Sequence, residues 1–107
     1  MSFNLHSNSM LVLSRDNEDL VLDLKVGQLV AKSRPGKARR FAIKKNNQSI
    51  KVDISSGQSE IKIANDKDDS ITISPLSGKV KVGLNGNSDT VTSDEKVNIK
   101  STGQIEK

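Results

Sequence analysis

The sequence predicts an all-β protein: a rolled or solenoid-like β-sandwich of about nine short strands that ends in a C-terminal hairpin. Three observations support this fold class. Apolar and polar residues alternate along most of the chain, the alternating runs recur about every ten residues, and no stretch has the apolar spacing of an amphipathic helix. Aromatic residues make up only 2% of the chain, which favours a roll of thin layers over a wide sandwich core.

Isoleucine, valine and leucine occupy the positions that we expect to face the core, as is typical of half-buried strands. The clearest alternating runs span residues 20–24, 50–54, 61–63, 71–73, 80–84 and 97–99. The expected strand centres lie near residues 22, 30, 42, 52, 62, 72, 81, 91 and 98. We expect the inward row to include Val52, Ile63 and Val82.

Turn-forming residues separate these runs. Lys25-Val-Gly27 predicts a turn between the first two strands, and Ser74-Pro75 with Ser77-Gly78 predicts another. Asn85-Gly86 predicts a tight antiparallel hairpin. Residues 14–20 fit a loop better than a single helical turn.

The 107 residues fit one domain. Residues 1–9 are polar and unpatterned, so we expect a flexible N-terminal arm there and a single all-β domain over residues 10–107. The first ten residues lack the basic and apolar regions of a signal peptide. We therefore expect either a cytoplasmic protein or a chain that begins after an export signal.

Residues suited to catalysis or to metal binding are scarce. The chain has no cysteine and one histidine, His6, so a zinc site and thiol chemistry are excluded. Asp66, Asp68 and Asp69 form the one carboxylate cluster, but the rest of a calcium-binding loop is missing, and a solvated turn is the simpler interpretation. We predict no enzyme, no catalytic residue, no cofactor and no metal.

The most suggestive feature is a basic stretch over residues 32–51, in a chain of net charge +4. The candidate partner-binding residues are Lys32, Arg34, Lys37, Arg39, Arg40, Lys44 and Lys45. Three interpretations remain open: a solvated face that protects strand edges, a contact surface for a protein or an anionic glycan, and a nucleic-acid site. The lack of aromatic residues for base stacking argues against nucleic acid.

The segment from Leu20 to about Ile105 resembles the FecR domain of bacterial envelope proteins. The matching pieces are the opening strand and glycine turn over residues 22–30, Pro35-Gly36 before Arg40-Phe41-Ala-Ile43, the strand over residues 75–82, and the closing hairpin and last strand over residues 85–99. Residues 57–61 and 92–95 depart from the family pattern. The resemblance implies an elongated or rolled β domain outside the cytoplasmic membrane that contacts other proteins.

We therefore expect a non-catalytic protein-interaction or scaffold domain of the bacterial cell envelope or periplasm, part of a larger protein with a role in signal transduction. The expected partner is another protein that adds an extended segment to an exposed strand edge. The alternative is a module that binds a polyanion, either an anionic glycan or nucleic acid, through residues 32–51. We expect no membrane insertion by this segment, because no run approaches the roughly 20 apolar residues of a membrane span.

Overall fold

The computed structural model describes residues 2–16, 19–33, 39–45, 48–54, 60–65, 70–84, 86–100 and 102–106. These residues contain strands and no helix, which confirms the all-β prediction. The strands are β1 (Ser2–Leu5), β2 (Met10–Asp16), β3 (Asp19–Lys32), β4 (Arg39–Lys45), β5 (Gln48–Ile54), β6 (Glu60–Asn65), β7 (Ile71–Ser77), β8 (Lys79–Leu84), β9 (Asn87–Thr92), β10 (Val97–Ile99) and β11 (Ile105–Glu106).

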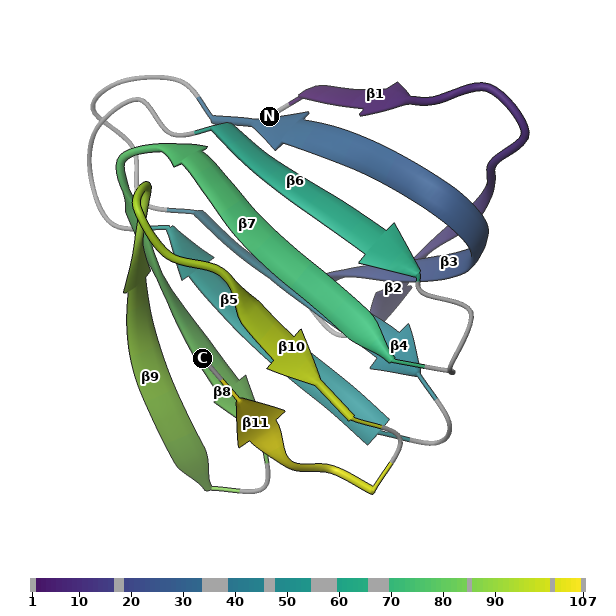
Figure 1. The fold of residues 1–107 in the computed structure, drawn as a ribbon. Helices are drawn as coiled ribbons and strands as arrows, with labels where there is room; N and C mark the ends of the chain where they lie inside the picture. Colours follow the sequence, from purple (N-terminus) through teal and green to yellow (C-terminus); the bar gives the residue numbers. More distant parts are fainter. Residues whose placement is uncertain are drawn as a thin grey trace.

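The strands form one curled sheet. Nine of them follow the order β11-β10-β7-β6-β3-β4-β5-β8-β9, and β1 and β2 both pair with β3 outside this path. All neighbours are antiparallel except β3 and β4. In Figure 1 the long ribbon of β3 curves around one side of the molecule, with β6 and β7 continuing in front of it and β4 and β5 behind. The predicted all-β roll is thus confirmed, but the strands correspond only in part: the two strands expected near residues 22 and 30 are the single strand β3, and β11 was not predicted.

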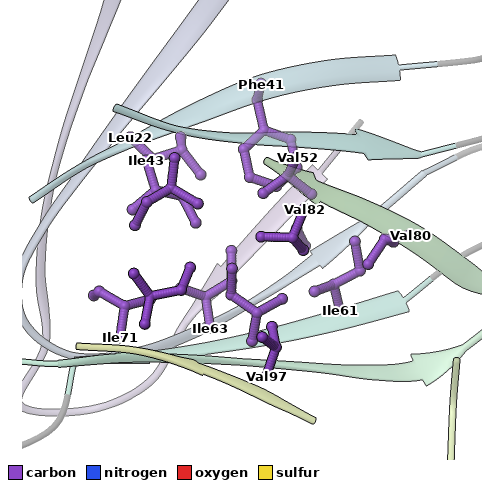
Figure 2. Close-up of a cluster of buried hydrophobic side chains, with 14 of the residues drawn as sticks. Leu22, Phe41, Ile43, Val52, Ile61, Ile63, Ile71, Val80, Val82 and Val97 are labelled. Atoms are coloured by element: carbon purple, nitrogen blue, oxygen red, sulfur yellow. The ribbon is translucent and has the colours of Figure 1, made fainter. Parts of the chain in front are cut away.

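The core fills the space between the two halves of the curled sheet. The alternating positions on β5, β6 and β8 are buried as predicted, with Val52, Ile63 and Val82 at most 1% exposed. Figure 2 shows Leu22, Ile43 and Val52 facing Ile63, Ile71 and Val97 across this space. Because each strand sends every second side chain inward, the core consists mainly of aliphatic residues, and Phe41 is the one aromatic residue of the buried cluster.

The β8–β9 hairpin confirms the antiparallel connection predicted from Asn85-Gly86, and Gly86 has a positive φ of 82°. Residue 85 lies outside the described part of the chain. A second hairpin, β10–β11, lies at the end of the described residues and was not predicted, because the last expected strand was centred near residue 98.

The turn predicted at Lys25-Val-Gly27 is wrong, because β3 runs through it as one strand of 14 residues. Its first half pairs with β2 and β4, and its second half pairs with β1 and β6. The buried positions change from Leu22 and Leu24 to Leu29 and Ala31, so the inward phase shifts by one residue at the bend. Gly27, with a φ of +93°, permits this shift.

The loop predicted over residues 14–20 is also wrong, since Ser14–Asp16 belong to β2 and Asp19–Leu20 begin β3. The apolar residues of β2 do not alternate with polar ones, which hid the strand. Likewise, part of the flexible arm predicted for residues 1–9 is a strand. Phe3 of β1 packs against Phe41 edge to face, with ring centroids 6.3 Å apart, and its burial stabilises β1 on the rest of the sheet.

The turn predicted at Ser74-Pro75 is wrong, because the strand continues through Pro75. Pro75 lies inside β7, where it is buried and pairs with Ile61 next to a register shift. On the other side of β7, β10 reaches only residues 71–73. Proline lacks an N–H, so it is tolerated where the hydrogen-bond ladder is already interrupted.

Candidate functional site

The structure distributes the predicted basic residues over two parts of the sheet. Lys32 ends the half of β3 that pairs with β6, and its Nζ lies 3.5 Å from Glu60 Oε1. Arg40 and Lys44 lie on the outer face of β4, where they alternate with the buried Phe41 and Ile43. Lys32 therefore contributes to a different surface from Arg40 and Lys44.

Four of the predicted partner-binding residues have side chains that the structure does not describe. Arg34 and Lys37 are outside the described residues, and of Arg39 and Lys45 the structure describes only the backbone, in β4. The proposed role of these four residues stays a prediction.

The outer face of β4 continues onto β5 and β8. It carries Lys51, the last residue of the predicted basic stretch, and two lysines of β8 that the sequence analysis did not select. Lys51, Lys79 and Lys81 are exposed there, and the strand register places Asp53 between Arg40 and Lys81. The alternation Lys79-Val-Lys81-Val was a usable signal: once the valines are assigned to the core, both lysines must face outward. We call Arg40, Lys44, Lys51, Lys79 and Lys81 the basic face.

A second surface is apolar and lies on β2. The structure pairs β2 with β3 alone, so the opposite edge of β2 has no strand beside it among the described residues. Met10, Val12 and Leu13 are 58%, 47% and 52% exposed. Val26, directly opposite Met10 on β3, is 53% exposed. We call Met10, Val12, Leu13 and Val26 the apolar strip.

The register of β2 shows why the strip is exposed. Leu13 lies opposite Leu22, so its side chain is on the core side of the sheet, yet half of it remains in solvent. Val12 lies opposite Asp23 and is on the outer side. The sheet thus presents apolar side chains on both faces of an unprotected edge, a combination that natural edge strands usually avoid. Arg15, also exposed, lies near the end of this strand.

The described residues offer little for catalysis. They contain no group of three or more histidine, cysteine or carboxylate side chains that could hold a metal ion. His6 is exposed between β1 and β2, and its backbone N–H donates to the carbonyl oxygen of Gln28 at 3.0 Å. The Asp66, Asp68 and Asp69 cluster lies outside the described residues. A membrane-spanning helix is likewise absent from the described segments.

Comparison with known proteins identifies the fold but not a family. No protein-family model matches the chain, and no curated protein has a significantly similar sequence. Two crystal structures of a "putative anti-sigma factor" from Parabacteroides distasonis are similar, with TM-scores of 0.60 and 0.59. Their sequences are 13% and 15% identical to this chain, and the matches cover 99% and 98% of it.

This chain therefore has an all-β fold that also occurs in those two structures. It spans only 58% of the length of each of the two neighbours. At this level of identity the likeness extends to the fold alone.

Proposed function

We propose that this domain is a non-catalytic protein-interaction module of a regulatory protein, and that it binds an extended segment of its partner at the free edge of β2. One observation carries the proposal: the edge of β2 that pairs with no other strand in the described part of the chain carries exposed side chains of the apolar strip. Added strands gain affinity from main-chain hydrogen bonds and specificity from alternate side chains. This edge offers both.

The strip and its surroundings define the chemistry of the partner segment. A strand added to β2 would cover Leu13 on the core side and Val12 on the outer side, so apolar residues are required on both faces of the segment. Arg15 forms no ion pair with the residues that the structure describes, and it favours an acidic residue at one end of the segment. The net charge of +4 favours approach of an acidic partner.

The FecR resemblance and the two structural neighbours support a regulatory role. The resemblance implies a domain outside the cytoplasmic membrane that contacts other proteins, and the neighbours bear the description of anti-sigma factors. We accordingly propose that the domain works in the periplasm or cell envelope as part of a signalling protein. Fractionation of cells that express the native gene tests this location, and recovery in the cytoplasm would contradict it.

Site-specific photocrosslinking tests the docking edge. A photoreactive phenylalanine analogue replaces Val12 in one variant and Leu76 in the other, in cells that express the native gene. Leu76 is the matched control, since it is 51% exposed but lies on β7, in the part of the sheet that continues from β6. We expect position 12 to crosslink one defined protein and position 76 to crosslink none.

The purified partner then allows a quantitative test. Val12→Lys should weaken its binding at least about tenfold, since a charge replaces an apolar contact. Leu76→Lys should leave the affinity unchanged. Equal crosslinking from both positions, or equal affinity of both lysine variants, would overturn the proposal.

A further inference from the structure

A hollow lies on the outer face of the sheet, over β5, β8 and the start of β9. Its volume is about 390 Å³, within the usual range for small-ligand sites. Gly83 forms part of its lining, and the register places Gly83 between Lys51 on β5 and Ser88 on β9. Because a glycine stands where neighbouring strands carry side chains, the sheet is depressed at this point.

The lining of the hollow combines positive charge with neutral polar groups. Lys51 and Lys81 line it, and neither forms an ion pair with any residue that the structure describes. Ser49, Asn87 and Ser88 add hydroxyl and amide groups. Asp53 also lines the hollow, but it lies in register between Arg40 and Lys81, which offset its charge.

The surface around the hollow is also positively charged. The basic face supplies five exposed cationic side chains on β4, β5 and β8, against the single carboxylate of Asp53 among the described outward side chains of these strands. Charges of one sign around a depression raise the local concentration of an oppositely charged ligand. The hollow is thus the most favourable position for an anion on this face.

We propose that the hollow binds an anionic sugar unit of a glycan. Lys51 and Lys81 would hold its carboxylate or phosphate, since an ammonium group donates charge-assisted hydrogen bonds to such oxygens. Ser49, Asn87 and Ser88 would hydrogen-bond the sugar hydroxyls. The site uses no residue of the apolar strip, so it is independent of the docking edge on β2.

Other polyanions fit the hollow less well. Nucleic-acid bases would need an aromatic platform. Of the two aromatic residues of the chain, Phe41 is buried in the core and Phe3 packs against it. An acidic peptide would need apolar side chains to pack against, and Leu84, the one large apolar residue in the described lining, is buried. A hollow of about 440 Å³ beside Lys62 and Lys96 is less suited, because the Thr72 hydroxyl and Asn65 amide in its lining already take part in hydrogen bonds.

Amide chemical shifts of the full chain test the proposal at constant ionic strength. The probes are hexagalacturonate for a carboxylate, mannose 6-phosphate for a phosphate, and neutral maltohexaose and poly-glutamate as comparisons. We expect saturable shifts at Gly83 and Ser88 with one of the two acidic sugars, and no saturable shifts with maltohexaose or poly-glutamate. Saturable binding of poly-glutamate at these amides, or of neither acidic sugar, would overturn the proposal.

Two double variants distinguish specific binding in the hollow from general attraction between the anionic sugar and a positively charged protein. Lys51→Gln with Lys81→Gln should lower the affinity at least about tenfold. Lys62→Gln with Lys96→Gln removes the same charge beside the other hollow and should lower it less than about twofold. An equal loss in both pairs would mean that only net charge matters and would overturn the proposal.

Gly83→Val tests the depression itself. A Cβ at Gly83 meets Asn87 O at 3.5 Å and Ser88 Cβ at 3.8 Å, which are ordinary contacts, so the fold should accept the substitution. The valine should fill the hollow and abolish binding while all the lysines remain. Unchanged binding in this variant, with an unchanged melting temperature, would show that the hollow is not the site.

Discussion

Gly27 is the residue on which the curl of the sheet depends most directly. Its φ of +93° is costly for any residue with a side chain, and the connection from β1 to β2 passes directly over it. The N–H of Gln28 donates to Ser9 Oγ at 3.0 Å. From the other side, Asn65 Nδ2 donates to the carbonyl oxygens of Leu24 and Lys25, each at 3.0 Å. Side chains from two other segments thus hold the bend.

Gly27→Ala should destabilise the protein by about 2–4 kcal/mol, measured by urea denaturation. Part of the loss comes from the positive φ, and part from the new Cβ, which would lie 2.7 Å from Ser9 Cα. Gly86→Ala is the matched control, because its φ of +82° is similar but nothing lies within 4 Å of the added Cβ. For Gly86→Ala we expect the free energy of unfolding to fall by about 1–2 kcal/mol. Equal losses at both positions would mean that Ser9 does not press on the bend.

At the scale of the element, the inward phase of each strand decides what the fold tolerates. Ile63→Asp on β6 should destabilise the protein by more than about 4 kcal/mol, because it leaves a carboxylate in an apolar core. Lys62→Asp, at the preceding residue and on the outer face, should cost less than about 1 kcal/mol. Thermal melting followed by circular dichroism compares them. Similar melting temperatures for the two variants would mean that the phase of β6 is wrong.

The alternation of apolar and polar residues predicted those strands that have one buried face and one exposed face. It did not predict strands whose two faces have similar environments. The strands β5, β6 and β8 were predicted because each has one face in the core and one face in solvent. β2 was missed because both of its faces are partly in solvent and both carry apolar residues. The same property makes β2 the candidate docking edge, so the failure of the pattern and the proposed function have one physical cause.

Long-range pairing could not be predicted from local pattern. Lys32 has no acidic neighbour in the sequence, yet β3–β6 pairing brings Glu60 to it. The hollow over Gly83 also depends on the β5–β8–β9 register, which joins residues far apart in the chain. Outward direction was predictable for Lys51 and Lys81 individually, but their position around one depression was not.

At the scale of the whole molecule, β3 ties the two halves of the curled sheet into one unit. Its residues pair with β2 and β4 before the bend and with β1 and β6 after it, and one buried cluster contains side chains from both halves. Neither half can lose β3 without exposing the core of the other. We therefore expect a single cooperative unfolding transition, as in most small domains.

Urea unfolding followed at two amides tests this cooperativity. Ile61 on β6 and Val82 on β8 report on opposite halves, and both are fully buried. Their resonances should vanish at the same urea concentration as the circular dichroism signal, and midpoints more than about 0.5 M apart would instead indicate two units. Gly27→Ala sharpens the test, because a weakened bend in a shared strand should lower both midpoints equally. A shift confined to Ile61 would mean that the bend belongs to the β6 half alone and that β3 does not couple the two.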